Sequence, residues 1–158
     1  MIHSLITYHK DIFMEIKQAT EDHIDYISDS LSNYFTEANA FFGYPRFKED
    51  YDLMSKYVSQ RVKDSDSKFY YFVALDDSDQ PLGFINLLNN GDNVGSILVT
   101  ISNQEEVIQE LVRYALDFFK EKGLTNIQSE YFEYQESLEK VFSELGMKQE
   151  MTSLRIDI

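Results

Sequence analysis

The chain has 158 residues, and its 28 acidic side chains outnumber 14 Lys and Arg, which gives a formal net charge of −14. The chain contains no cysteine, so disulfide scaffolds, zinc–thiolate sites and cysteine nucleophiles are excluded. Its three histidines, His3, His9 and His23, have no ligand spacing, so we predict no metal site. The negative charge disfavours binding to nucleic acids and anionic membranes and favours cationic partners.

The composition also predicts how the chain is organised. No stretch is long and apolar enough to span a membrane, and the N-terminal apolar stretch is too short for a signal peptide, so we expect a cytoplasmic protein. With 43% hydrophobic residues, six glycines and two prolines, the chain has the composition of a folded domain. We find no linker or repeat, and therefore predict an N-terminal extension over 1–13 and a single domain over 14–158.

The first elements are predicted from alternation and helical spacing. Residues 14–19 alternate as a short strand, and Thr20 is placed to cap a helix. Gly43 and Pro45 then end this helix. A second helix is predicted over 47–63, where apolar side chains recur on one face.

The middle of the chain is predicted to form strands. An aromatic and β-branched run over Phe69–Leu75 and a second run over 81–88 flank a polar turn, which is the pattern of an antiparallel hairpin. A turn over 89–93 leads to the next strand, at 95–101.

The last third is predicted to alternate helices and strands. Ser102 and Glu105 match a capping box at the start of a helix over 103–121, and Gly123 follows its end. The remaining predicted elements are a strand at 127–132, a helix at 135–145 and a strand at 151–158. Aromatic side chains at 41–47, 69–72, 114–119 and 131–134 are predicted to line the core and a groove.

The order of these elements, with the residues at their joints, resembles the GNAT acetyltransferase superfamily. The matching segments are Ile16-Lys-Gln-Ala-Thr20 with Asp22 and Ile24, Pro81-Leu-Gly83-Phe84-Ile85, and Ala115 with Gly123 and Val141-Phe142-x-x-x-Gly146-Met147. The resemblance covers about 14–158. It implies an α/β fold of the α+β type, with a mixed, mostly antiparallel sheet of about six strands and helices on both faces. The strands at 95–101 and 127–132 are expected to splay apart, with helix 103–121 packed on the sheet.

The resemblance implies acetyl-CoA as a cofactor, bound between these two strands. The family's pyrophosphate loop, Q/R-x-x-G-x-G/A, corresponds to 103–108 or 104–109, where this sequence has no glycine. Glu105 and Glu106 fall in the first helical turn, where carboxylates stabilise a helix but repel a diphosphate. The pattern therefore favours a stable helix start over a diphosphate site. The residues implied in cofactor binding are Val99, Ile101, Asn103, Gln104 and Gln135.

The resemblance also indicates the catalytic residues. The family's frequent general acid is a tyrosine, and Phe142 occupies the matching position, where it has no proton to give. Glu130 is the candidate general base on the strand at 127–132, although a charged residue at an edge strand is also typical of a solvated surface.

Two functions follow from these residues. The first is a GNAT-like acyl-CoA-dependent N-acetyltransferase with a divergent cofactor loop, acting on a cationic amine of a small molecule or a protein. The second is a catalytically inactive GNAT-fold module for binding, regulation or dimerisation. A homodimer is compatible with either function.

Overall fold

A six-stranded sheet forms the centre of the protein in the computed structural model, which describes residues 4–9, 12–132 and 134–149. The strands lie in sequence order, and neighbours are antiparallel except for the parallel pair β5–β6. Their bounds are β1 Ser4–His9, β2 Ile12–Gln18, β3 Phe69–Leu75, β4 Pro81–Gly91, β5 Val94–Ser102 and β6 Asn126–Ser129. The predicted mixed, mostly antiparallel sheet is confirmed.

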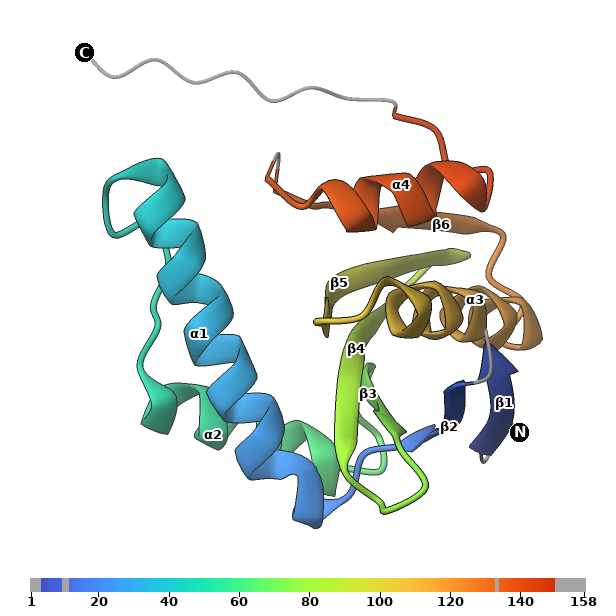
Figure 1. Cartoon of the computed structure of the whole chain (residues 1–158), viewed down its shortest axis with the longest axis horizontal. Coiled ribbons are helices and arrows are strands. Elements are labelled where there is room, and N and C mark those ends of the chain that lie inside the picture. The colour runs from blue at the N-terminus through green and yellow to red at the C-terminus, as the bar shows by residue number, and fades with distance from the viewer. Residues whose placement is uncertain (1–3, 10–11, 133, 150–158) are drawn as a thin grey trace.

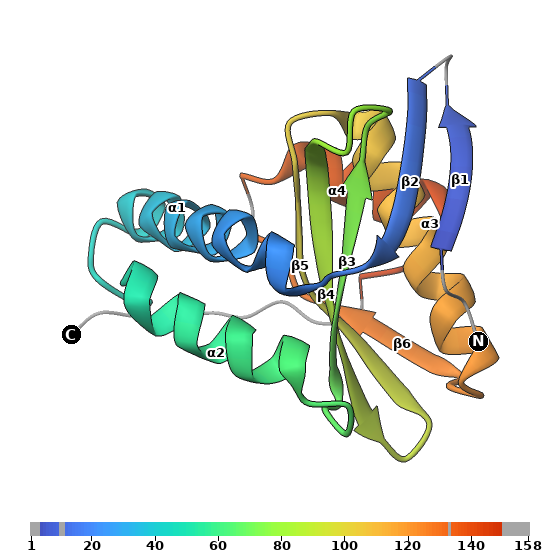
Figure 2. The same cartoon turned by 90° about the horizontal axis from the view of Figure 1, so that it is seen from below.

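Helices cover both faces of the sheet, as predicted (Figures 1 and 2). One face carries α1 (Ile24–Phe42), which follows the short 3-10 helix η1 (Glu21–His23), and α2 (Tyr51–Lys63). The other face carries α3 (Glu105–Glu121) and α4 (Glu136–Glu144).

The ends of the chain differ from the prediction. The sheet begins before residue 14, inside the segment predicted as an extension, because β1 pairs with β2 over its whole length. No glycine or proline marks the turn between these strands, so the sequence contains no hairpin signal there. The predicted strand at 151–158 lies outside the described residues.

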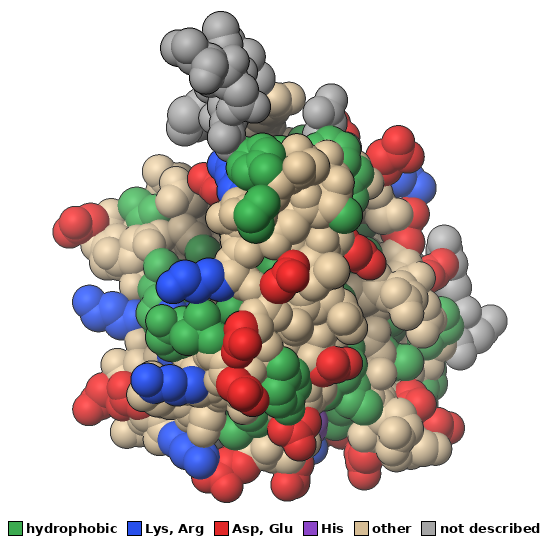
Figure 3. Space-filling view, turned by 90° about the vertical axis from the view of Figure 1, so that its left-hand side faces the viewer, with side chains coloured by type: hydrophobic (Ala, Val, Ile, Leu, Met, Phe, Trp, Pro, Cys, Tyr) green, Lys and Arg blue, Asp and Glu red, His purple; other side chains and the backbone are tan. Residues whose placement is uncertain are grey.

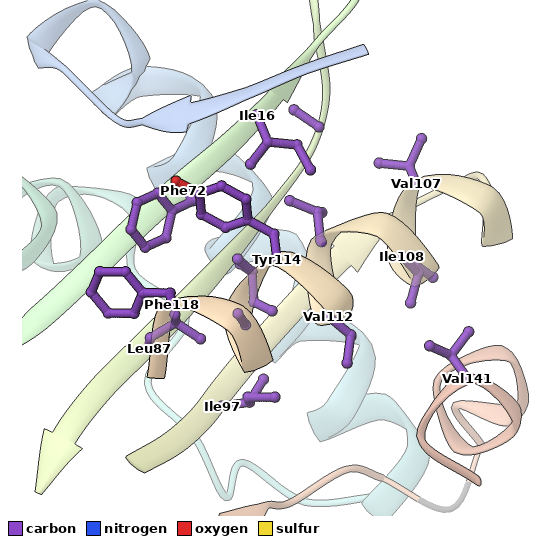
Figure 4. Packing of buried hydrophobic residues seen from close by; sticks show 14 of the residues in the cluster. Ile16, Phe72, Leu87, Ile97, Val107, Ile108, Val112, Tyr114, Phe118 and Val141 are labelled. Atoms are coloured by element: carbon purple, nitrogen blue, oxygen red, sulfur yellow. The ribbon is translucent and has the colours of Figure 1, made fainter. Parts of the chain in front are cut away.

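A large core lies between the sheet and α3 (Figure 4). Phe72 of β3 is in its centre, and its ring lies 4.9 Å from the ring of Tyr114 and 5.0 Å from that of Phe118. Val141 and Phe142 of α4 belong to the same core. These contacts fix α3 against the sheet and therefore fix the position of its N-terminus.

Tyr114 in this core gives a stability prediction. Its hydroxyl is buried without a hydrogen-bond partner among the described residues, and burial, with a smaller effect of Glu121, raises the pKa of Tyr114 to about 12. The folded state keeps the Tyr114 proton above pH 10, where an unfolded tyrosine loses it. The contribution of this proton to the free energy of unfolding is therefore present below pH 10 and is lost towards pH 12.

We expect Tyr114→Phe to be as stable as the wild type at pH 7, or more stable by up to about 1 kcal/mol, because a buried unpaired hydroxyl is removed. The variant should also lose less stability between pH 10 and pH 12. Urea unfolding at several pH values measures both effects, with the exposed Tyr57→Phe as control. A loss of more than about 1 kcal/mol at pH 7 would show that the hydroxyl has a partner.

A second core lies under α1 and α2 and includes Ile27, Leu31, Met54 and Val58. Helix α1 ends at Phe42, and Gly43 follows with a φ of 75°, as the sequence predicts. Helix α2 begins later than predicted, at Tyr51. Its start is fixed by Asp50, whose carboxylate accepts a 3.0 Å hydrogen bond from the backbone N–H of Leu53.

Candidate functional site

Strands β5 and β6 pair only over the first part of β5, in agreement with the prediction that they do not pair fully. They pair in parallel over only four positions, from Val94↔Asn126 to Ile97↔Ser129. Strand β5 continues to Ser102 and stays paired with β4, whereas no described residue pairs with its other edge beyond Ile97. The backbone N–H and C=O groups on this edge therefore have no strand partner among the described residues, and we call this open edge of β5, beside the point where the chain leaves β6, the splay.

A β-bulge marks the point where the strands separate. The register of β4 and β5 shifts between Asn86↔Val99 and Leu87↔Ile97, which leaves Leu98 as an extra residue on β5. The bulge reverses the alternation of side chains. Ile97 thus packs in the core under α3, whereas Val99 and Ile101 pack against the core under α1 and α2.

The start of α3 differs from the predicted capping box. The residue at the N-cap of α3 is Gln104, and Ser102 is the last residue of β5. The Ser102 hydroxyl donates a 2.7 Å hydrogen bond to the backbone carbonyl of Leu82 and accepts a 3.1 Å bond from the N–H of Gln104. It therefore ties the neighbouring strand β4 to the turn before α3, and the predicted bond from Glu105 is not formed.

Removal of this hydroxyl should be measurable. We expect Ser102→Ala to lower the free energy of unfolding by about 1–2 kcal/mol, because two partly buried backbone groups lose their partner. Urea denaturation is the measurement, and the exposed Ser143→Ala on α4 is the control. An unchanged midpoint for Ser102→Ala would show that water replaces the hydroxyl without cost.

An ion pair joins the start of α3 to α4. The Lys140 ammonium lies 2.9 Å from a carboxylate oxygen of Glu105, and this hydrogen bond raises the pKa of Lys140, with added effects of Glu144 and Glu106. The sequence did not indicate this pair, because the partners are 35 residues apart. Lys140 is therefore already paired with a carboxylate, which reduces its ability to attract an anion to the start of α3.

The helix start does not fit the diphosphate of acetyl-CoA. The N–H groups of Gln104, Val107 and Ile108 donate to acceptors within the chain, at 3.1–3.2 Å. The Glu105 and Glu106 side chains add two negative charges in the first turn. A helix N-terminus binds anions through unpaired N–H groups and its positive dipole end, and here the two carboxylates of the first turn oppose that positive end.

The splay itself fits the amide-containing pantetheine arm of acetyl-CoA better. Its open β5 edge supplies backbone donors and acceptors. Next to this edge, Thr100 lies opposite Ile85, on the face of the sheet that α3 covers; it is 5% exposed, and its hydroxyl has no hydrogen-bond partner among the described residues. Nothing in the sequence indicated Thr100, since a threonine in a strand is common.

Four of the residues predicted for the cofactor lie near the end of β5 and the start of α3: Val99, Ile101, Asn103 and Gln104. Asn103 is exposed. Gln135 lies on the other side of the splay, just before α4. Its side-chain oxygen accepts a 2.7 Å bond from the N–H of Phe132, and its side chain also bonds the Tyr34 hydroxyl.

The predicted catalytic positions lie on the same side as Gln135. Strand β6 ends at Ser129, so Glu130 lies just beyond the strand rather than within it, and its side chain is exposed. Phe142 is 4% exposed and packs 6.0 Å from the ring of Tyr131. No proton donor is present at the Phe142 position.

Aromatic rings connect α1 and the following loop to the chain after β6. Phe132 is at their centre, with ring centroids 5.5 Å from Tyr34 and 5.4 Å from Phe47. We call this cluster the aromatic bridge, and its members are Tyr34, Phe41, Phe42, Phe47, Phe132 and Tyr134. Burial and the nearby Tyr134 raise the pKa of Tyr34, so its hydroxyl stays neutral. The bridge therefore joins α1 and the loop after it to the chain that follows β6.

The face formed by α1 and α2 carries acidic side chains spread among polar ones, and Lys and Arg gather along one side of it (Figure 3).

Within the described ranges, no three His, Asp or Glu side chains are grouped so that they could hold a metal ion. A shallow open pocket lies elsewhere and contains none of the predicted site residues. It is lined by Gln18, Ala19, Thr20, Glu21, Val62 and Lys63.

Comparison with known proteins gives similarity in structure but not in sequence. No family model and no curated protein matches the sequence. A probable acetyltransferase superposes with a TM-score of 0.67 at 19% identity, over 90% of this chain and 97% of that one. The aminoglycoside N-acetyltransferase AAC(6')-Iy, solved with CoA, gives 0.68 at 13% identity, over 100% and 99%. A transcriptional regulator from Bacillus halodurans C-125 gives 0.69 at 15% identity, over 98% and 100%. In the part of the chain that the structure describes, no helix has the length and apolar character needed to cross a bilayer.

Proposed function

We propose that this chain, which has the fold of the GNAT acetyltransferases, is an N-acetyltransferase that uses an acyl-CoA-type thioester and acts on an amine of a small molecule or a protein. The observation that carries this proposal is the splay, with the free edge of β5 beyond the bulge at Leu98. A strand edge of this kind pairs with the amide groups of an extended ligand.

The donor is held mainly by the splay and little by the start of α3. The β5 edge supplies backbone hydrogen-bonding groups that have no strand partner among the described residues. Glu105 and Glu106 oppose a diphosphate, and Lys140 is already paired with Glu105. The proposed binding energy therefore comes from the pantetheine part of the donor.

The acceptor is a cationic amine, which the net charge of −14 attracts to the protein. Glu130 is the group that accepts the amine proton, since its carboxylate is exposed at the end of β6. Phe142 has no proton to donate, so no general acid acts at that position. The acidic, cysteine-free composition also supports a cytoplasmic location.

Comparison of two donors tests the proposal. Acetyl-CoA carries the diphosphate, whereas S-acetylpantetheine lacks it. We expect both compounds to raise the melting temperature by a few degrees at about a hundredfold excess over Kd, with Kd values within about threefold of each other. Binding of acetyl-CoA a hundredfold tighter than S-acetylpantetheine would show that the phosphorylated adenosine diphosphate part of the donor supplies much of the binding energy, against the proposal. Binding of neither compound would contradict the proposed function.

The role of Glu130 gives a separate prediction. We expect Glu130→Gln to bind the donor as the wild type does and to transfer the acetyl group about tenfold more slowly, a modest effect because water can replace an exposed base. The chain has no cysteine, so a thiol reagent detects only the thiol released by transfer. Glu144→Gln on α4 is the control. An unchanged rate would exclude Glu130 as the base.

A second candidate is a GNAT-fold binding or regulatory module without transfer chemistry. The Glu105–Lys140 ion pair and the buried Phe142 favour it, because each occupies a position that the family uses for its cofactor or its general acid. One structural neighbour is described as a transcriptional regulator. Absence of donor binding and of thiol release with a panel of polyamines and aminoglycosides would favour this candidate.

A further inference from the structure

Strand β1 forms one edge of the sheet and is unusual for an edge strand. Its residues, Ser4–His9, include no Lys, Arg, Asp, Glu or Pro, and its pairing with β2 runs over six positions without a bulge. Edge strands normally carry charges, proline or bulges that prevent further pairing. Among the described residues none pairs with the outer edge of β1, and Figure 2 shows this strand at the margin of the sheet.

Apolar side chains of β1 are exposed. Ile6 is 60% exposed, Tyr8 is 70% exposed and Leu5 is 38% exposed. Ile6 and Tyr8 lie on the face of the sheet opposite the core under α3, because their partners on β2 are Glu15 and Phe13. The Tyr8 ring contacts the Phe13 ring at 5.5 Å. An apolar strip therefore runs beside an open hydrogen-bonding edge.

We propose that β1 pairs with β1 of a second copy of this chain, in antiparallel orientation, to form one continuous twelve-stranded sheet from two six-stranded sheets. A two-fold axis perpendicular to the sheet relates the two strands. Each copy then supplies the same edge and the same apolar strip to the other, as an isologous interface requires.

Charge identifies the second copy as the occupant. A cationic partner would be drawn to the acidic surface that gives the chain its net charge of −14, and β1 carries no charge to attract it. Two copies repel each other over most of their surfaces, so they approach most easily where charge is absent. The uncharged β1 meets this condition, and edge-to-edge extension of the sheets keeps the two bodies apart.

The side chains favour a register centred on Thr7. A perpendicular two-fold axis keeps each face of the sheet continuous, so residues opposite each other must share a face. In this register Thr7 lies opposite Thr7 of the second copy, and Ile6 lies opposite the second copy's Tyr8. Threonine pairs and pairs of a β-branched with an aromatic residue are favourable across strands.

Variants with a single introduced cysteine test this arrangement. The chain has no cysteine of its own, so any disulfide must form between the introduced residues. Directly opposite residues of an antiparallel pair have Cα atoms about 4.5–5.5 Å apart, within the range of a disulfide. We expect Thr7→Cys to form a disulfide-linked dimer under mild oxidation. We expect Ile6→Cys, two positions out of register, and Ser143→Cys on α4 to form no disulfide-linked dimer. Efficient cross-linking of Ile6→Cys but not of Thr7→Cys would overturn the proposed pairing.

Sedimentation measurements on the cysteine-free protein provide an independent test. We expect a dimer at about 100 µM whose affinity increases between about 50 mM and about 500 mM NaCl, since salt screens the repulsion. Tyr8→Lys should weaken the dimer at least about tenfold. The control, Tyr57→Lys, makes the same change at a 44% exposed ring on α2, outside the proposed interface, and should not weaken the dimer. A wild type that stays monomeric in both salts, or equal effects of the two variants, would overturn the proposal.

Discussion

Acetyl-CoA is expected to bind about ten- to a hundredfold more tightly when the variant Glu105→Gln/Glu106→Gln removes the two carboxylates at the start of α3. A unit charge pair about 4 Å apart is worth about 1 kcal/mol in water, the diphosphate carries more than one negative charge, and every 1.4 kcal/mol is about tenfold in affinity. The substitution also frees Lys140, which Glu105 holds at 2.9 Å. The same change should cost about 1 kcal/mol of helix stability.

Two controls make this result specific. S-acetylpantetheine has no diphosphate, so its affinity should not change. The variant Asp117→Asn/Glu121→Gln removes the same amount of charge from the other half of α3, where both side chains are exposed, and it should leave acetyl-CoA binding nearly unchanged. Calorimetric titration of the three proteins with both compounds is the measurement. An equal gain for both donors would show that the carboxylates act through the fold and not on the diphosphate.

Gly83→Ala is expected to lower the free energy of unfolding by about 3 kcal/mol, at the high end of the range for overpacking. A Cβ at this position would lie 2.5 Å from the backbone oxygen of Ile101 and 2.8 Å from the Cβ of Ser102. The oxygen belongs to the neighbouring strand and cannot rotate away, so β4 and β5 must move apart beside the splay.

Gly91→Ala is the control for this prediction. Gly91 has a φ of 76°, and a Cβ at this position would have no other atom within 4 Å, so alanine there should cost only about 1–2 kcal/mol of backbone strain. Urea unfolding of the two variants separates crowding from strain. If Gly83→Ala costs no more than Gly91→Ala, the two strands can separate at this point without penalty.

Where local signals were strong, the sequence predicted the elements well. Strand β3 begins and ends as predicted, because its aromatic and β-branched run is bounded by polar turns. Gly123 ends α3 as predicted, with a φ of 76°. Such features depend on a few neighbouring residues, which is why one sequence is enough to place them.

Where partners are distant in sequence, the prediction failed. Ser102 matches a capping box, but its hydroxyl bonds the carbonyl of Leu82, twenty residues away on the adjacent strand. The strand predicted at 127–132 ends at Ser129, because the partner strand bulges away after Ile97. Local spacing contains no information on either contact.

The candidate site was predicted only in part. The replacement of loop glycines by Glu105 and Glu106 is visible in the sequence, and it correctly indicates a helix start with a carboxylate-rich first turn. The pairing of Glu105 with Lys140 and the buried hydroxyl of Thr100 depend on how α3, α4 and β5 pack together. These features therefore required the three-dimensional structure.

The bulge at Leu98 divides β5 into two segments with different strand pairing. The first segment, paired with β4 and β6, behaves as an interior strand, whereas the second is paired only with β4. Amide protons that point into the splay can exchange with solvent through small local fluctuations, while those facing β4 need the two strands to separate. Within β5 we therefore expect the fastest amide exchange at the splay, and a ligand that fills it would slow exchange there before any change in shape becomes visible.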